Sequence, residues 1–241
     1  MRENGWEKTK FLIDGFPRNA ENYDGFYEVF GDEADVRGVL YLDLSEEKMM
    51  ERIQKRAEQA GEGNQRADDN VESIKKRFKT FQDETMPVVE TFKSKNMCFY
   101  VSSDNTIEGV AADVRACVDK LLTPSTELNK VPVPLNLEEP LKAEELEKLN
   151  AVEIPDKPIV VFALGGSGAG KSTQCQMIVA NYGFIHLCVG DLLNAERIRE
   201  ESPHSVKIEE CLKNGDLVPH DITHDVLRKA MKVEGWTNSK F

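Results

Sequence analysis

The sequence lacks an apolar run long enough to cross a membrane, and it lacks any CxxC pair. Its five cysteines are scattered as Cys98, Cys117, Cys175, Cys188 and Cys211. An odd, unclustered set of this kind predicts reduced thiols that pack as small apolar side chains. The first residues also lack the apolar core of a secretory signal peptide. We therefore expect a cytoplasmic protein.

A surplus of basic side chains is also missing. Acidic residues number 43 against 31 basic ones, which gives a formal net charge of −12. Proteins that bind nucleic acid or anionic membranes need a basic surface, so we expect neither partner. Hydrophobic residues make up 40% and charged residues 31%, the balance of a globular rather than a disordered chain.

The two ends of the chain resemble each other. Residues 1–11 (MRENGWEKTKF) and residues 231–241 (MKVEGWTNSKF) share Met, Gly-Trp and Lys-Phe at the same offsets. Self-similarity of this kind is typical of repeat proteins. In a longer parent protein, we therefore expect the residues after Phe241 to resemble those after Phe11, with Trp6 and Trp236 as equivalent packing residues.

Composition divides the chain into three parts. Residues 1–121 alternate short apolar runs with charged, periodic segments, which predicts alternating strands and helices. Residues 122–157 hold five prolines and many acids, which predicts a linker with one short helix at Lys142–Asn150. Residues 158–241 begin with another strand, followed by glycines and a helix. The expected strands are Thr9–Asp14, Val36–Leu44, Met97–Ser102 and Pro158–Leu164, and the expected helices are Ser45–Ala60, Asn70–Lys93 and Thr173–Tyr182.

A phosphate-binding motif follows the strand at 158–164. GGSGAGKS (Gly165–Ser172) matches GxxxxGK[ST] in full and precedes an expected helix. Its glycines let backbone N–H groups turn toward a phosphate, and the helix N-terminus adds positive charge. Lys171 is expected to bridge the β- and γ-phosphates, and the Ser172 hydroxyl to hold Mg²⁺. The motif predicts a bound nucleoside triphosphate but does not choose the reaction.

A second motif, KFLIDGFPRN, lies near the start of the chain. Asp14 ends a buried strand, and Arg18 follows in a turn. A carboxylate at the end of a parallel strand beside a phosphate loop is placed to orient the water shell of Mg²⁺. A guanidinium binds phosphate through two parallel hydrogen bonds. Alone, the pair is equally compatible with a structural salt bridge.

Together, LIDGFPRN, GGSGAGKSTQC, HLCVGDLL and NGDLVP resemble the nucleoside monophosphate kinases, which include adenylate kinase and UMP/CMP kinase. The resemblance covers nearly all of residues 1–121 and 158–241. It implies an α/β P-loop kinase fold of three layers, α/β/α, with a five-stranded parallel sheet, a helical monophosphate-binding segment and a short lid. It also implies phosphoryl transfer from Mg²⁺·ATP to a nucleoside monophosphate.

The resemblance also implies roles for individual residues. The lid runs from Arg56 to Arg77 and includes Asp68-Asp69-Asn70, and its closure excludes water. His186 and His220 are expected to pack or cap rather than catalyse. The implied catalytic residues are Lys171, Asp14, Arg56, Arg66 and Arg77. ATP and its metal are assigned to Gly165, Gly168, Ala169, Gly170, Lys171, Ser172, Thr173 and Asn105, with Asp14 acting on the metal through water. The monophosphate is assigned to Gly15, Phe16, Pro17, Arg18, Asn22, Val189, Asp216, Leu217 and Val218.

Asn22 stands where this family addresses the acceptor base, four residues after Arg18. At this position the resemblance implies Gln in adenylate kinases and Asn in UMP/CMP kinases. The shorter amide presents one donor and one acceptor that suit a pyrimidine edge. UMP or CMP is therefore the favoured acceptor, and AMP stays as the alternative.

Three features depart from the family pattern. Asn194 replaces an arginine that contacts the monophosphate, which predicts weaker monophosphate use unless Arg197 or Arg199 substitutes. Cys188-Val189 replaces Ser-Thr. The spacing from Arg56 to Arg66 is longer than in the family. These departures leave open an alternative function, a weakened kinase fold that serves as a structural or nucleotide-binding module.

The order of the halves is inverted, because the phosphate loop precedes the Asp-Gly-Phe-Pro-Arg segment in the family. Residues 1–121 correspond to the C-terminal half of a kinase domain and residues 158–241 to the N-terminal half. The chain is then one period of a tandem array, a permuted domain closed through its linker, or one of several copies that exchange halves. Its expected partners, besides ATP and a monophosphate, are neighbouring repeats or another copy. An array of this kind suits a ciliary or cytoskeletal structure.

Overall fold

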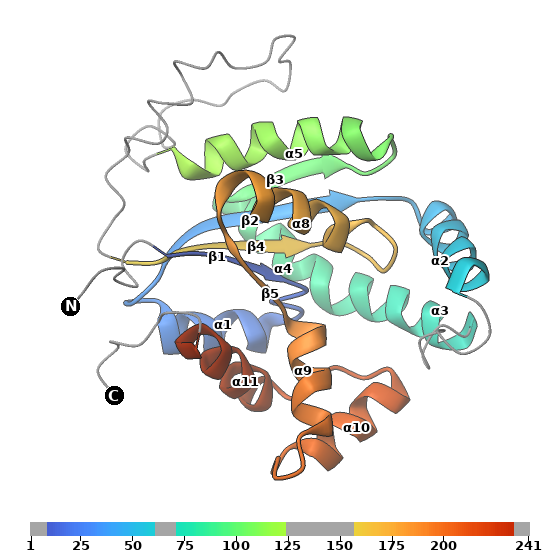
Figure 1. Cartoon of the computed structure of the whole chain (residues 1–241), viewed down its shortest axis with the longest axis vertical. Coiled ribbons are helices and arrows are strands. Elements are labelled where there is room, and N and C mark those ends of the chain that lie inside the picture. The colour runs from blue at the N-terminus through green and yellow to red at the C-terminus, as the bar shows by residue number, and fades with distance from the viewer. Residues whose placement is uncertain (1–8, 61–70, 124–156, 234–241) are drawn as a thin grey trace.

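The computed structural model describes residues 9–60, 71–123 and 157–233 (Figure 1). At its centre lies a five-stranded sheet in the order β3-β2-β4-β1-β5, with every pair parallel. The strands are β1 (Lys10–Asp14), β2 (Asp35–Asp43), β3 (Cys98–Ser102), β4 (Ile159–Leu164) and β5 (Ile185–Cys188). The predicted α/β fold with a five-stranded parallel sheet is confirmed.

Strands from both ends of the chain alternate in this sheet. β4 is the central strand and pairs with β1 on one side and β2 on the other, so that Phe162 lies opposite Ile13 and Val39. β5 pairs with β1, and Leu12 lies opposite His186. The segment after residue 157 thus contributes the centre and one edge of a sheet whose other strands come from the first 123 residues.

Ten helical elements surround the sheet in the described part of the chain. The predicted helix at Asn70–Lys93 is two helices joined by a π-helical turn at Phe81–Thr85. Pro87 lies in the first turn after this junction and has no backbone N–H to donate, which accounts for the altered ladder. Those two helices are α3 (Val71–Thr80) and α4 (Met86–Ser94). The other helices are α1 (Ala20–Phe30), α2 (Glu46–Ala60), α5 (Ile107–Leu122), α8 (Lys171–Tyr182), α9 (Val189–Ile198), α10 (Ser205–Asn214) and α11 (His220–Val233).

Helices cover both faces of the sheet (Figure 1). α5 and α8 lie on one face, and α1, α4 and α11 on the other. Successive strand residues point to opposite faces, so Ile13 and Phe162 join one apolar core while Leu12 and Val161 join the second. Because both faces are covered, the central strand β4 is apolar and buried at every position, as is typical of parallel sheets.

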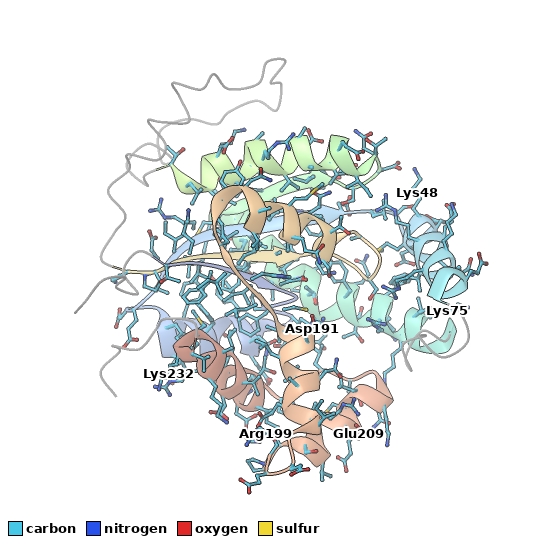
Figure 2. All side chains as sticks on the ribbon, viewed as in Figure 1. Lys48, Lys75, Asp191, Arg199, Glu209 and Lys232 are labelled. Carbon is cyan, nitrogen blue, oxygen red and sulfur yellow. The ribbon has the colours of Figure 1, made fainter. Side chains whose placement is uncertain are left out.

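The remaining helices extend from the carboxyl ends of the strands. α2 and α3 lie at one side and α9 with α10 at another (Figure 1). Charged side chains such as Lys48, Arg199 and Lys232 lie at the periphery (Figure 2). Among the described helices, none combines the length and apolarity that a membrane span requires. The predicted helix at Lys142–Asn150 and both tryptophans fall outside the described residues.

Candidate active site

A cleft of about 1050 Å³ opens at the carboxyl ends of the strands. Asp14, Arg18 and Arg77 from the first segment line it together with Lys171 and Val218 from the second. In an open parallel sheet, ligands bind at this end of the strands. The cleft therefore lies where the fold favours a ligand, and both segments of the chain form its walls.

The phosphate-binding loop connects β4 to α8 and depends on glycine at two positions. Gly168 has φ +86° and Gly165 has φ +155°, values that residues with a Cβ rarely adopt. A Cβ on Gly168 would lie 2.9 Å from the carbonyl oxygen of Met49, and one on Gly165 would lie 2.5 Å from that of Leu42. The loop is therefore packed closely against β2 and α2, which belong to the other segment.

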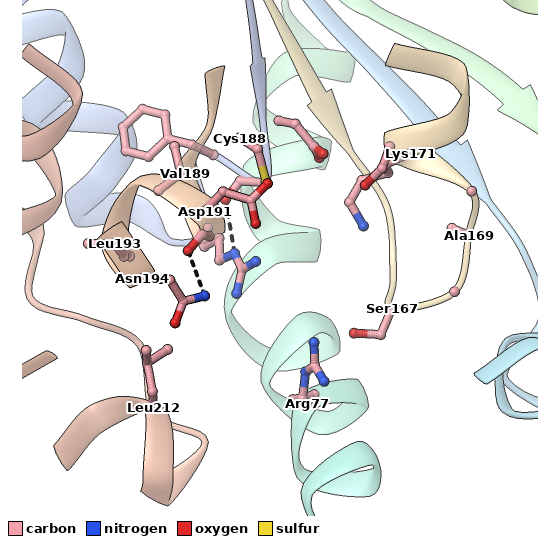
Figure 3. A pocket seen from close by; sticks show the side chains of 18 of the residues that line it. Arg77, Ser167, Ala169, Lys171, Cys188, Val189, Asp191, Leu193, Asn194 and Leu212 are labelled. Carbon is pink, nitrogen blue, oxygen red and sulfur yellow. Dashed lines mark hydrogen bonds between the residues drawn. The ribbon is translucent and has the colours of Figure 1, made fainter. Parts of the chain in front are cut away.

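Lys171 lies folded over this loop. Its Nζ donates to the carbonyl oxygens of Gly165 at 2.8 Å and Gly166 at 3.0 Å. Burial lowers the pKa of its ammonium group, and the charge of Asp14 opposes that effect. Arg18 and Arg77 lower the same pKa further, because each places a second positive charge nearby. Three cations and one carboxylate thus act on one another at the floor of the cleft, and Figure 3 shows the side chains of Lys171 and Arg77 on its walls.

The turn after β1 presents Arg18 to the cleft. Gly15 has φ +74°, and its N–H donates to the carbonyl oxygen of Ala163 at 3.0 Å. The Arg18 Nε donates to the carbonyl oxygen of Gly15 at 2.9 Å, and the Thr85 hydroxyl donates to the Arg18 carbonyl at 2.8 Å. Because these bonds hold the turn from both sides, the Arg18 guanidinium is fixed next to the phosphate-binding loop.

Asn22 is buried in the first turn of α1, where it also lines the cleft. Its side-chain Oδ1 accepts a hydrogen bond from the backbone N–H of Arg18 at 3.2 Å. Asn19 caps the helix by accepting from the Asn22 N–H at 2.9 Å. The amide of Asn22 is therefore oriented by the same turn that positions Arg18.

The opposite wall of the cleft comes from α9 and from the loop between α10 and α11. The Asn194 Nδ2 donates to the carbonyl oxygen of Gly190 at 3.1 Å, within its own helix (Figure 3). Asp216 is held by Lys76 of α3, whose Nζ lies 2.8 Å from its Oδ1. The same Nζ also bonds the carbonyl oxygen of Asn214. This wall is thereby linked to the helix that carries Arg77.

Nearly all of the predicted site residues meet at this cleft. Three do not line it: Gly165 lines a smaller adjoining cavity, Pro17 lines neither, and Arg66 lies outside the described residues together with Asp68–Asn70. The residues predicted for catalysis, for ATP and for the monophosphate otherwise border one continuous space. Their roles remain predictions.

Arg52 and Arg197 also line the cleft, although neither was among the predicted site residues. Arg197 had been named only as a substitute for the arginine that Asn194 replaces. The Arg52 Nη2 donates to the carbonyl oxygen of Ser103 at 2.7 Å, and Arg197 bonds Glu209 of α10. Arg52 and Arg56 are four residues apart on one helix and so share a face, a spacing from which Arg52 could have been found.

Comparisons with known proteins agree with this geometry. A family model described as adenylate kinase matches residues 1–97 and 163–241. Adenylate kinase isoenzyme 5 of Mus musculus is 31% identical over 246 aligned residues, which cover 93% of this chain and 42% of that protein. UMP-CMP kinase of Gallus gallus is 50% identical over 84 residues, which cover 35% of this chain and 43% of that protein.

The aligned chain thus spans less than half the length of these relatives. The family match, by contrast, covers most of this chain and leaves out residues 98–162. The matched residues include β1, β2 and β5, the phosphate-binding loop and the Gly15–Arg18 turn, whereas β3 and most of β4 lie outside the match. By sequence and by fold, the chain belongs to the adenylate kinase family.

Proposed function

We propose that this chain transfers the γ-phosphoryl group of ATP to a nucleoside monophosphate, producing two nucleoside diphosphates, in a site that its two segments form together. The observation that supports this most strongly is the single cleft that joins the Lys171 loop to Asp14 and Arg18. Each segment alone holds only part of the required chemistry, because the phosphate-binding loop and the acceptor turn lie in different segments.

The phosphate-binding loop is assigned the donor nucleotide. Lys171 gives up its bonds to the carbonyl oxygens of Gly165 and Gly166 and takes the β- and γ-phosphates instead. The residues present also fit Mg²⁺, because Asp14 and Ser172 both border the cleft and offer the oxygen ligands that this ion prefers. Bound Mg²⁺ would supply neutralisation of the charge on the phosphates.

We assign to Arg18 and Arg77 the stabilisation of the negative charge that develops on the transferred phosphoryl group. Both guanidiniums act electrostatically on Lys171, and all three side chains border the same cleft. Arg56 borders the same cleft from α2. Planar guanidiniums suit the spread negative charge of a phosphoryl group in transfer. Closure of the lid over them excludes water, so that the phosphoryl group reaches the monophosphate rather than a water molecule.

We assign recognition of the acceptor base to Asn22. With its Oδ1 bonded to the Arg18 N–H, the amide nitrogen is the group left to donate to the edge of a base. A pyrimidine presents carbonyl oxygens that accept such a bond, which favours UMP or CMP. AMP is the alternative acceptor.

A second candidate function is a nucleotide-binding module with weakened activity. Asn194 carries no charge, and its amide bonds the carbonyl oxygen of Gly190 rather than reaching across the cleft. A charged hydrogen bond to the monophosphate is worth about 1.5–3 kcal/mol. Loss of this hydrogen bond favours a protein that binds ATP but transfers its phosphoryl group slowly.

The arrangement of the halves extends this proposal to a longer protein. We infer that such a protein repeats residues 1–121, the linker 122–157 and residues 158–241 in this order, with neighbouring repeats as partners. The similarity of residues 1–11 to residues 231–241 supports it. So does an alignment that runs through 93% of this chain within a relative more than twice as long. A cytoplasmic array, in a cilium or along the cytoskeleton, is the setting that this arrangement suits.

The test is ADP formation from Mg²⁺·ATP with AMP, CMP or UMP, measured over a range of protein concentrations. We expect turnover per chain to be independent of concentration, to favour UMP or CMP, and to vanish in Lys171→Ala but not in the exposed control Lys207→Ala. Activity that rises with concentration would show that halves are completed between molecules. ATP binding without turnover would favour the second candidate.

A further inference from the structure

A group of three potential metal ligands lies behind the phosphate-binding loop. Asp14 ends β1, Cys175 lies on α8, and His186 lies on β5. One ligand atom of each lies within 4.8 Å of the others. The Asp14 Oδ2 and the His186 Nε2 are 3.7 Å apart. A carboxylate, a thiol and an imidazole are thus gathered at one point in the interior.

Two polar atoms of this group find no hydrogen-bond partner in the part of the chain that the structure describes. Asp14 is 3% exposed and Cys175 is 1% exposed. The Asp14 Oδ1 and the His186 Nε2 are buried and have no hydrogen-bond partner among the described residues. Buried polar atoms are almost always hydrogen-bonded, so two unpartnered atoms on adjacent side chains indicate a missing ligand.

The fold places these side chains together through sheet register and helical spacing. Leu12 lies opposite His186 in the register of β1 and β5. Asp14 is two residues after Leu12 on the same strand and therefore faces the same side of the sheet, toward α8. Cys175 is one helical turn after Lys171, which turns its thiol inward beneath the loop.

We propose that Asp14, Cys175 and His186 bind one divalent ion of intermediate softness, of the class of Zn²⁺ or Co²⁺. Sulfur, nitrogen and oxygen donors together suit such ions, whereas Mg²⁺ prefers oxygen alone. Three protein ligands leave a fourth tetrahedral position for water. The ion reaches the site past His186, whose side chain is 21% exposed on the edge strand β5.

Binding requires the three ligand atoms to move closer together. Tetrahedral zinc with ordinary bond lengths separates its ligand atoms by about 3.4–3.6 Å. The observed O···N distance is 3.7 Å, and no pair of ligand atoms exceeds 4.8 Å. On binding, the Cys175 thiol forms a metal–sulfur bond and releases its proton to solvent, while neutral His186 binds through Nε2 and keeps its proton on Nδ1.

The ion would act on the cleft through Asp14. It takes the carboxylate that faces Lys171 and adds positive charge next to that ammonium. Binding of the ion and binding of Mg²⁺·ATP should therefore weaken each other. This consequence rests on the proposed function, whereas binding of the ion does not.

The test titrates the metal-free, reduced chain with Co²⁺, because a cobalt–thiolate bond has a near-ultraviolet charge-transfer band. We expect one equivalent of Co²⁺ to produce the band and Zn²⁺ to displace it. Cys175→Ser should abolish the band, and His186→Gln should weaken Co²⁺ affinity at least tenfold. Cys211→Ser is the matched control, because this other buried cysteine lies on α10, and it should keep the band unchanged.

X-ray absorption of the zinc-loaded chain provides a second measurement that does not depend on a variant's folding. One sulfur ligand with nitrogen and oxygen ligands supports the site. No sulfur, two sulfurs, or a Cys211→Ser variant that loses the cobalt band would overturn it. A chain that binds zinc as described but never binds ATP would refute the proposed function and leave the metal site standing.

Discussion

The N–H of Gly15 donates a hydrogen bond to the carbonyl oxygen of Ala163 at 3.0 Å. This one contact fixes the turn that carries Arg18 to the strand that carries the phosphate-binding loop. It joins backbone to backbone and belongs to the register in which Asp14 lies opposite Ala163. Assembly of the site is therefore tied to correct pairing of β1 with β4.

Cleavage of the linker should leave the two segments associated. A protease site placed within residues 124–156 would cut the chain without touching the sheet. Since β4 pairs with strands of the other segment on both sides, we expect both fragments to elute together in size-exclusion chromatography under native conditions. Separate elution would contradict the intrachain pairing, and uncut chain is the control.

Asn194→Arg should improve use of the monophosphate. Asn194 is exposed and borders the cleft, so an arginine at this position has space to reach a phosphate. A charged hydrogen bond of about 1.5–3 kcal/mol predicts a KM for the monophosphate lower by about 10- to 150-fold. Steady-state kinetics at saturating ATP provides the measurement. Asn194→Ala should change KM little, and an arginine variant indistinguishable from alanine would refute the idea.

Gly168→Ala should destabilise the chain more than Gly183→Ala. Both glycines have positive φ, +86° and +67°, so alanine at either costs about 1–2 kcal/mol in backbone strain. At Gly168 the new Cβ would also meet a backbone atom, the Met49 oxygen, at 2.9 Å, whereas no atom of the described residues lies within 4 Å of a Cβ at Gly183. We expect an additional loss of about 1–3 kcal/mol in urea unfolding. Equal losses would show that α2 can move away from the new Cβ at little cost in free energy, and would contradict the prediction.

The free energy of unfolding should decrease as the pH is lowered, because His224 is buried. This side chain is 7% exposed between α11 and α1, and its Nε2 lies 3.2 Å from the carbonyl oxygen of Asn22. Burial lowers its pKa from the ordinary value of 6.5, an effect that the bond to Asn22 partly opposes. The unfolded chain therefore binds more protons near pH 6, so this contribution is complete above pH 6.5 and declines as pH falls.

The variant His224→Gln isolates that contribution. Glutamine keeps an N–H donor for the Asn22 carbonyl but does not titrate. In urea unfolding at pH 7.5, 6 and 5, wild type should lose stability relative to the variant as the pH is lowered. A constant difference between the two proteins would show that His224 has the same pKa in the folded and unfolded states, and would contradict the prediction.

The local parts of the site could be predicted because neighbouring residues encode them. The glycines before Lys171, the strand before them and the helix after them are contiguous, and so are Asp14, the turn and Arg18. The contacts of Arg52 and Lys76 and the environment of His186 could not be found in this way. Their partners, Ser103, Asp216 and Asp14, lie far away in sequence, and nothing in the local pattern specifies such contacts.

The sequence by itself determined which groups are available: a phosphate-binding loop, an acidic strand end, a set of arginines, and a neutral Asn194 where the family has a cation. Apolar runs and helical spacing also determined the alternation of strands and helices. Only the tertiary structure decided that β4 enters between β1 and β2 of the same chain. Parallel strands pair through backbone groups that every residue carries, so strand order follows from the packing of both apolar cores rather than from any short motif.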